Sequence, residues 1–437
     1  MAVDSIQNIF RIPELKRRVF YTVALLAVYR IGAHIPTPGI NGEALAEFIA
    51  RTQGTIFGFF DMFSGGALGQ MTIFALGIMP FISSSIILDL LSVVFPTLAK
   101  LKKEGEQGRK KLNQYARYGT VVLSVVQSFG ISIGLEKMTS PGGVPVVPLP
   151  GWSFRLLTIL TLTAGTVFIM WLGEQITERG IGNGISLIIF AGIVTGIPRA
   201  VGNTLSLIRT GELAPLLMLV LLAMMVVVIG VIVVLESGYR KIPIQSAKRV
   251  VGRRVYGGQS TYLPLKINPS GVIPPIFASS IIAFPATIAQ FADIPWIQSV
   301  SSSLSPGGLL YTLLTVLLIF FFAYFYTAII FNPDDVADNL KKSGGFVPGI
   351  RPGKNTSQFV DRILSRLTFT GAIYLSVIVI LPTYLIQHMR VPFYFGGTAL
   401  LIVVGVAMDT MQQVESHLVM RNYEGFMKKG RLRGRRG

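Results

Sequence analysis

The chain has 437 residues, of which 51% are hydrophobic and only 14% are charged, and its mean hydropathy is +0.60. Soluble domains of this combined length would need a much larger share of charged surface. The 39 Lys and Arg outnumber the 21 Asp and Glu, and the net charge of +18 favours an anionic partner or membrane surface. The absence of cysteine excludes disulfides and thiolate metal sites, and three scattered histidines argue against a histidine metal cluster. The composition therefore predicts a membrane protein without metal or cofactor, and it excludes most soluble enzymes.

Ten apolar stretches are candidates to cross a membrane as helices, since a hydrocarbon core of about 30 Å needs roughly twenty helical residues. In chain order they are residues 19–35, 71–92, 118–135, 154–172, 184–201, 214–235, 272–291, 309–331, 367–386 and 392–411. A short amphipathic helix on the membrane surface is expected before the first span, at residues 4–15. The pattern predicts an all-α polytopic membrane protein with ten transmembrane helices.

Basic residues alternate between crowded and sparse connections along these spans. The N-terminus, the connections after spans two, four, six and eight, and the C-terminal tail together hold 32 of the 39. Six lie on the opposite side, and Arg30 lies inside the first span. Because cytoplasmic loops are enriched in Lys and Arg, both termini are predicted to be cytoplasmic.

The ten spans divide into two halves of five, and an odd number of spans inverts the second half relative to the first. The expected regions are a cytoplasmic segment 1–18, a first half 19–213, a second half 214–412 and a basic cytoplasmic tail 413–437. Spans two and seven carry a trace of this repeat. Allowing one inserted residue, 77–87 and 271–282 both read glycine, two aliphatics, proline, isoleucine and then serines before paired isoleucines. The alternative is coincidence, since glycine, proline and serine are frequent in membrane helices.

Spans two and seven also contain proline, at Pro80 and at Pro274 and Pro275. Proline frees backbone groups that hydrocarbon cannot satisfy, so both spans are expected to face the interior of the bundle. Their serines suit a helix–helix seam that opens and closes, because hydrogen bonds across such a seam are weak. A static packing seam is the alternative.

The segment 54–70, between spans one and two, is apolar and aromatic in its first half and rich in glycine in its second. It is too short to span a membrane and too apolar for a solvated loop, which favours a re-entrant or half-buried segment. An interfacial aromatic anchor is the alternative.

Two predicted cytoplasmic connections, 236–267 and 332–366, are unusually long. The first alternates apolar and polar residues around Ile242 and Ile244, which makes a β-hairpin plausible. Their basic residues are explained by membrane topology alone, but their length is not. Both features fit a docking surface for an acidic or phosphate-bearing partner.

The sequence contains no catalytic motif and no energy source of its own. HExxH is absent, and the GxSxG match at 130–134 lies inside the predicted span 118–135 and not at a strand-to-helix turn. The glycine run 180–184 is typical of a helix start, and residues 353–356 lack the P-loop pattern. Charged residues within the spans lie toward the span ends. The midplane is therefore apolar and suits a seal better than a solute site.

Several segments resemble the bacterial members of the SecY/Sec61-alpha family. They read MFSGGAL at 62–68, FALGIMP at 74–80, WLGEQITERGIGNG at 171–184, ADNLKKSG at 337–344 and VPFYFGGT at 391–398. The likeness continues in one register from residue 15 to residue 411. The resemblance implies a protein-conducting channel with two inverted five-helix halves around a central hourglass pore, and no enzymatic activity.

The resemblance also implies a ring of six aliphatic residues at the waist of the pore. By matching motif positions they are Ile78, Ile82, Ile185, Ile189, Ile276 and Ile402. Span arithmetic agrees independently for three of them, because Ile82, Ile276 and Ile402 lie about 12–17 Å into their spans, near mid-membrane.

Three further sets of residues follow from the family. The plug that covers the pore would comprise Ile56, Phe57, Phe59, Phe60, Asp61, Met62, Phe63, Ser64, Gly65 and Gly66. The lateral gate, formed by spans two and seven, would include Ser83, Ser84, Ser85, Asp89, Asn268, Ser279 and Ser280. Asp89 departs from the uncharged polar residue expected at its position. Arg253, Arg254 and Arg351 in the two long connections would dock the motor or the ribosome.

The family implies partners and a location as well. They are SecE and SecG in a heterotrimer, the SecA motor, the translating ribosome, signal sequences and secretory polypeptides, anionic lipids, and the bacterial plasma (inner) membrane. A secondary transporter with an inverted repeat is the main alternative function, and a structural membrane protein is a weaker one.

Overall fold

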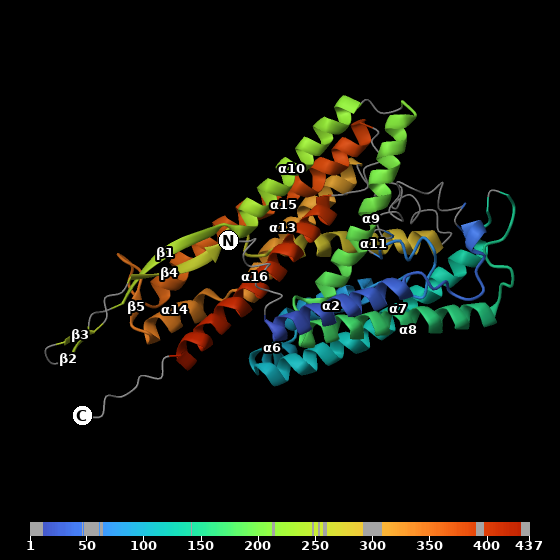
Figure 1. Cartoon of the computed structure of the whole chain (residues 1–437). Helices are drawn as coiled ribbons and strands as arrows, with labels where there is room; N and C mark the ends of the chain where they lie inside the picture. The colour runs from blue at the N-terminus through green and yellow to red at the C-terminus, as the bar shows by residue number, and fades with distance from the viewer. Residues whose placement is uncertain are drawn as a thin grey trace. The chain divides into compact units, whose positions relative to one another are not determined.

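The computed structural model of the chain is mostly helical (Figure 1). It describes residues 12–45, 47, 61, 64–140, 142–211, 215–246, 249–251, 254–256, 260–291, 308–389 and 397–429. Its helices are α2 (Pro13–Gly32), α5 (Met79–Val94), α6 (Pro96–Lys103), α7 (Glu106–Lys137), α8 (Trp152–Arg179), α9 (Gly184–Arg209), α10 (Pro215–Ser237), α11 (Ile273–Phe291), α13 (Leu309–Ile330), α14 (Pro333–Lys342), α15 (Lys354–Met389) and α16 (Gly397–Lys429). Its strands are β1 (Tyr239–Ser246), β2 (Arg249–Val251), β3 (Arg254–Tyr256), β4 (Ser260–Lys266) and β5 (Gly345–Phe346).

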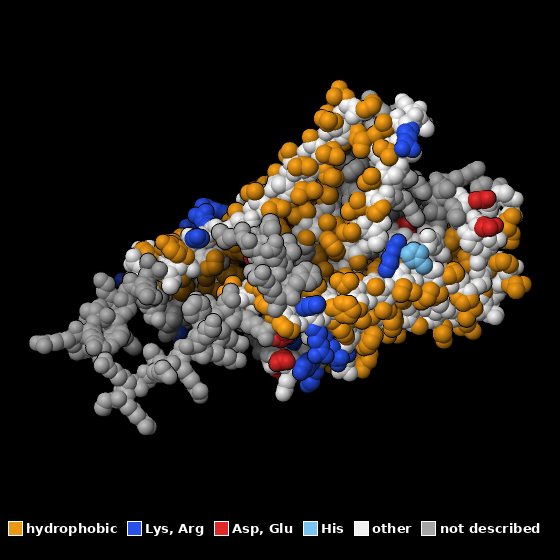
Figure 2. Space-filling model, viewed as in Figure 1, with side chains coloured by type: hydrophobic (Ala, Val, Ile, Leu, Met, Phe, Trp, Pro, Cys, Tyr) orange, Lys and Arg blue, Asp and Glu red, His pale blue; other side chains and the backbone are white. Residues whose placement is uncertain are grey.

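Helices long and apolar enough to cross a membrane number seven among the described residues, and the bent pair α5 and α6 brings the number to eight. Only 11% of the most apolar stretch of α10 is buried. Figure 2 shows hydrophobic side chains spread over the visible face of the molecule. A soluble protein rarely exposes so large an apolar surface, whereas in a membrane protein the lipid tails cover such a surface. The predicted multi-pass membrane protein is confirmed.

The first of two compact units contains Met1–Gly202, Pro285–Ser301 and Val406–Gly437. Within it α7 lies beside α8, and α5 packs on α7 (Figure 1). Thr120, Ser124 and Ser128 recur every four residues on the buried face of α7, and each hydroxyl donates to a carbonyl one turn earlier on its own helix. The hydroxyls therefore need no partner outside the helix. Because the side chains are small, the backbones of neighbouring helices can approach this face closely.

The second unit contains Asn203–Phe284 and Ser302–Gly405. In it α13 packs along α15, and α14 packs against the start of α15. Phe277 of α11 meets the rings of Phe322 and Tyr326 edge-on, with centroids 5.4 and 6.4 Å apart. Such edge-to-face pairs add specificity to apolar packing.

A three-stranded sheet of order β4-β1-β5 joins the two long connections. β1 pairs antiparallel with β4, with Ile242 opposite Leu263, and with β5, with Gln245 opposite Phe346. The buried side chains of Ile242 and Leu265 pack in one cluster with Val360 of α15. The hairpin predicted in 236–267 is confirmed. The connection 332–366 contains α14, β5 and the start of α15.

The repeated glycine–proline pattern encodes the same local turn in both units. Gly77 and Gly271 have φ values of 57° and 61°, and α5 and α11 each begin two residues later. A positive φ is accessible to glycine at little cost, and proline is favoured in the first helical turn. The shared pattern therefore starts both helices in the same way.

Some helix boundaries differ from the predicted spans. Residues 71–78, placed in the second span, form turns, because the positive φ of Gly77 delays the helix until Met79. α2 begins at Pro13, inside the predicted surface helix 4–15, of which residues 4–11 lie outside the described residues. α16 continues to Lys429, well past 411, because no proline interrupts it.

The close contact of α8 with the turns before α5 predicts a sharp difference between two helical glycines. A Cβ at Gly165 would lie 1.9 Å from the carbonyl oxygen of Ile73, whereas one at Gly230 of α10 would meet nothing within 4 Å. Gly165→Ala is expected to lower the Tm of the detergent-solubilised protein, because overpacking costs about 1–3 kcal/mol. Gly230→Ala is the matched control and should be neutral or slightly stabilising. An equal Tm for both variants would contradict the packing described.

Candidate functional site

The residues between the predicted plug and α5 are held between α2 and α8. The ring of Phe74 stacks on Tyr29 of α2 and on Phe168 of α8, with both centroid distances 6.0 Å. A Cβ at Gly32 would lie 2.1 Å from the Phe74 ring, so this position requires glycine. The non-helical part of the second span therefore packs in the interior of its unit, as the prolines predicted.

The described end of the plug segment is fixed by hydrogen bonds to backbone atoms. The Tyr29 hydroxyl donates to the carbonyl of Ser64 at 3.1 Å, and Arg30 Nη1 donates to the carbonyl of Gly65 at 2.9 Å. The Asp61 carboxylate accepts the Gly69 N–H at 2.5 Å. These bonds hold the end of the predicted plug segment. We call residues 64–69 the base of the plug.

Two consecutive glycines form the turn within this base. Gly65 and Gly66 have φ values of 69° and 85°, a region that other residues enter only with strain. A Cβ at Gly65 would also lie 2.9 Å from Cα of Gly192 in α9, whereas one at Gly66 would meet nothing within 4 Å. Gly65 thus allows two backbones to touch.

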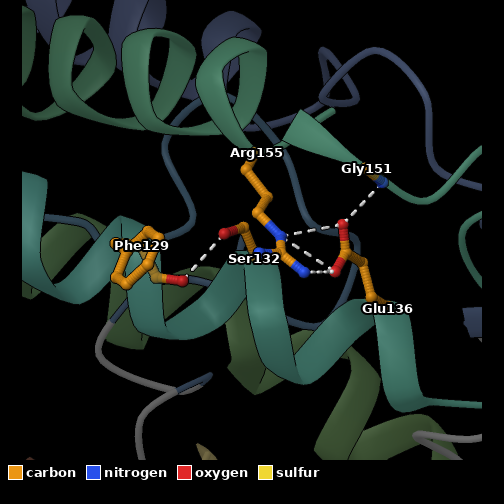
Figure 3. A network of polar contacts seen from close by, with 5 residues as sticks. All are labelled: Phe129, Ser132, Glu136, Gly151 and Arg155. Atoms are coloured by element: carbon orange, nitrogen blue, oxygen red, sulfur yellow. Dashed lines mark hydrogen bonds and ion pairs between the residues drawn. The ribbon is translucent and has the colours of Figure 1, made fainter. Parts of the chain in front are cut away.

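A polar network closes the α7–α8 hairpin beside this segment (Figure 3). The Glu136 carboxylate accepts hydrogen bonds from Arg155 Nη2 at 2.6 Å and from the Gly151 N–H at 2.9 Å. The Arg155 guanidinium also lies 5.4 Å from the centre of the Trp152 ring. Leu68, Met71 and neighbouring apolar residues pack in one buried cluster with residues of α7 and α8. This cluster gives the base of the plug a rigid support.

All six predicted pore residues are buried or half-buried. Ile78 and Ile82 lie at the start of α5, and the N–H of Ile82 donates to the Ile78 carbonyl at 3.2 Å. Ile82 and Ile189 are 8% and 3% exposed, and Ile185 is half-buried one turn before Ile189 in α9. These four belong to the first unit. In the second unit Ile276 of α11 is half-buried, and Ile402 of α16 is 1% exposed.

The predicted gate residues of α5 differ in their surroundings. The Ser84 hydroxyl donates to the Ala116 carbonyl of α7 at 2.8 Å, so this serine belongs to the α5–α7 packing seam. Ser83 and Ser85 are half-buried. Asp89, the residue that departs from the family pattern, forms an ion pair with Lys102 of α6 at 3.2 Å. Its charge is compensated within the bent α5–α6 pair.

The predicted gate residues near α11 are tied into their own unit. The buried Asn268 donates from Nδ2 to Glu236 Oε1 of α10 at 2.7 Å and to the Gly271 carbonyl at 3.0 Å. Its Oδ1 accepts the Ser270 hydroxyl at 2.9 Å. The Ser279 and Ser280 hydroxyls both donate to the Ile276 carbonyl. Asn268 thus fixes the start of α11 against the end of α10.

Part of the predicted site lies outside the described residues. This applies to the plug residues Ile56, Phe57, Phe59, Phe60, Met62 and Phe63 and to Arg253 of the docking set. Arg254 belongs to β3, and Arg351 is exposed between β5 and α15. No group of three metal-ligating side chains occurs in the described part of the chain.

Sequence reasoning missed three residues that organise this site: Tyr29, Arg30 and Glu236. Arg30 was noted only as a charge near a span end, and Glu236 only as the start of a loop. A single charged residue directly bordering an apolar run was the available signal, since such a charge needs a partner.

Several solved structures share this fold. A protein-conducting channel matches with a TM-score of 0.65 and 17% identity, covering 95% of this chain and 97% of that one. Sec61 in the canine ribosome–channel complex from the endoplasmic reticulum matches with a TM-score of 0.62 and 16% identity, covering 95% and 97% of the two chains. The fold class is therefore that of the protein-conducting channels, as predicted.

The sequence profile of the SecY family matches residues 72–411. The protein translocase subunit SecY of Escherichia coli strain K12 is 53% identical over 425 residues, covering 96% of each chain. The chain belongs to the SecY family. Membership makes it a channel subunit of the protein translocase and not an enzyme, and it rules against the solute transporter.

Gly65 and Gly66 provide a matched pair for testing the base of the plug. Alanine at either position adds left-handed strain of about 1–2 kcal/mol, but only Gly65→Ala also presses on the Gly192 backbone. We expect Gly65→Ala to lower the Tm of the detergent-solubilised protein more than Gly66→Ala. The reverse order would show that α9 does not contact the base.

The hydrogen bond between Asn268 and Glu236 can be tested by replacing the amide with a carboxylate and then the carboxylate with an amide. Asn268→Asp places a second carboxylate where an amide now donates at 2.7 Å, and a loss of the order of 3 kcal/mol is expected from two buried like charges. Adding Glu236→Gln restores one donor and one acceptor and should recover most of the Tm. An additive fall in the double variant would argue against a direct bond.

Proposed function

We propose that this chain forms the pore through which unfolded secretory polypeptides cross the membrane, and that it releases hydrophobic segments laterally into lipid. The observation that carries the proposal is that none of the six predicted pore residues is exposed: four are buried and Ile185 and Ile276 are half-buried. Ile82 is 8% exposed, whereas Ile87, five residues later on the same helix, is 46% exposed. A lipid-facing role for the six positions would have predicted the opposite.

The proposed seal depends on the chemistry of aliphatic side chains. A narrow ring of isoleucines offers water and ions no hydrogen bonds, so it dewets and blocks conduction. The same side chains are flexible enough to part around an extended peptide. No chemical step is required of the chain, which agrees with the absence of catalytic motifs.

The plug and the lateral gate complete the proposed mechanism. The plug segment, whose base is bound to α2 and packed against α9, would cover the pore at rest and move when a polypeptide enters. α5 and α11 would form the gate. A segment leaves through it only if its transfer into hydrocarbon is favourable, at about −0.3 to −0.6 kcal/mol for each central Leu or Ile.

The partners and location belong to the same proposal. SecE and SecG would complete a heterotrimer in the bacterial inner membrane, and the SecA motor would supply the energy that this chain lacks. Among the similar solved structures is a ribosome–channel complex, which supports ribosome docking. Arg253, Arg254 and Arg351 would provide positive charge for docking on the cytoplasmic side, where both termini and anionic lipid headgroups would also lie.

Two cysteine variants on one helix test the pore assignment, because the chain contains no cysteine of its own. Ile82→Cys is expected to crosslink to a secretory polypeptide arrested during translocation, whereas Ile87→Cys is expected to remain unlinked. The two positions differ in exposure but share residue type and helix. The measurement is the yield of the crosslinked product in membranes that contain the assembled translocase.

Equal crosslinking at both positions, or crosslinking at Ile87→Cys alone, would refute the pore assignment. Ile276→Cys provides a second pore position in the other unit and should behave as Ile82→Cys does.

A further inference from the structure

We propose that Tyr29 and Arg30 are positioning residues that clamp the base of the plug and thereby keep the resting channel closed. The inference rests on the proposed function, because it assigns a role to the segment that the proposal identifies as the plug. It concerns α2, none of whose residues belongs to the predicted pore, gate or plug.

Two adjacent side chains of α2 hold two adjacent peptide groups. Tyr29 donates to the carbonyl of Ser64 and Arg30 donates to the carbonyl of Gly65. Both acceptors are backbone atoms, so the clamp depends on where the segment lies and not on which side chains it carries. Displacement of the base would break both bonds together.

The Tyr29 hydroxyl is held in place by its surroundings. Tyr29 is 2% exposed, and its ring stacks nearly parallel to Phe74, with an interplanar angle of 8°. Phe74 in turn stacks on Phe168 of α8. A buried hydroxyl without an acceptor is costly, and the Ser64 carbonyl is its acceptor here. The aromatic stack therefore aims the hydroxyl at the base of the plug.

Arg30 adds a charge to the clamp. Its side chain is half-buried near the end of α2, where an unpartnered guanidinium would be unfavourable in a membrane-spanning chain. Its bond to the Gly65 carbonyl is charge-assisted, and such bonds are stronger than those between neutral groups. Arg30 thus loses a partner when the base leaves α2, which favours the closed position.

The opposite side of the base is also closed. Gly65 lies against Gly192 of α9, and the Ser64 hydroxyl accepts the Leu68 N–H at 3.0 Å. The Gly66 N–H donates to the Asp61 carbonyl at 2.8 Å, which turns the chain back on itself. Among the described residues, the base is therefore held by side-chain donors of α2 and by backbone packing against α9.

The test uses the complete translocase reconstituted in liposomes, with two readouts. Hydrogen exchange of the peptide containing residues 64–69 reports opening of the base, because the Gly66, Leu68 and Gly69 N–H groups are hydrogen-bonded to Asp61 and Ser64. Ion leak without a translocating chain reports closure. We expect Arg30→Gln to speed exchange about tenfold, since a bond from a charged donor is lost, and to raise the leak severalfold. Tyr29→Phe keeps the ring stack and should cause a smaller increase in both.

Matched controls remove the same groups elsewhere. Tyr21→Phe deletes a hydroxyl from the same helix, and Arg209→Gln deletes a positive charge from an exposed position at the end of α9. Neither should change exchange at 64–69. Arg30→Lys retains the charge and should recover part of the protection of residues 64–69 from exchange. If Arg30→Gln fails to accumulate, Arg30→Lys and Tyr29→Phe still test the clamp.

The outcomes distinguish failure of the proposed clamp from failure of the proposed pore. Unchanged exchange in the Tyr29 and Arg30 variants would overturn the clamp. Faster exchange without leak would overturn its role in closure, provided that Ile402→Asn, a polar substitution at the proposed pore ring, does leak in the same liposomes. If Ile402→Asn does not leak either, the proposed pore itself fails, and the further inference fails with it.

Discussion

The structure depends on one constraint, which is that backbone N–H and C=O groups inside a membrane must find partners within the protein. Residues 64–78 are not helical in the described structure, so they cannot satisfy these groups within one helix. The end of α2 and the residues that follow it supply many of the partners. The Ile73 N–H donates to the Ile35 carbonyl, and the Thr37 N–H donates to the Met71 carbonyl. The side chains of Tyr29 and Arg30 donate to the carbonyls of Ser64 and Gly65, respectively. The irregular segment is therefore anchored by hydrogen bonds to α2 and to the residues that follow it.

Small residues make this arrangement possible. Gly32 leaves room for the Phe74 ring, Gly165 for the Ile73 carbonyl and Gly65 for the backbone of α9. Lipid provides little hydrophobic drive between helices, so close packing and satisfied hydrogen bonds provide most of the cohesion. The Glu136–Arg155 pair then closes the neighbouring hairpin at its loop end. Rigidity around the base of the plug thus arises from packing geometry together with a few well-placed bonds.

Much of the fold could be predicted from the sequence, because apolar runs, basic loops and the glycine–proline pattern are local signals. The hairpin in 236–267 was predicted from alternation around Ile242 and Ile244, and it forms in that register. The turns at 71–78 were not predicted, since their apolar residues have the composition of a span and only Gly77 marks the break. Ser84 could not be assigned to the α5–α7 seam from sequence, because its partner is a backbone carbonyl 32 residues away. Tyr29 and Arg30 bind backbone carbonyls, which every residue has, so the sequence contains no complementary residue type that would reveal these contacts. The pore, plug and docking assignments came from family resemblance, and burial of the six isoleucines supports only the first of them.

The small sheet outside the membrane helices has a consequence for how this chain tolerates change in length. β5 adds to β1 through Gln245 and Ser246, so two connections that are far apart in sequence share a single hydrogen-bonded register. An insertion within β1 would shift the faces of Ile242 and Ile244 and simultaneously misalign Phe346. A change in the length of one connection at this sheet must therefore preserve the pairing with the other connection.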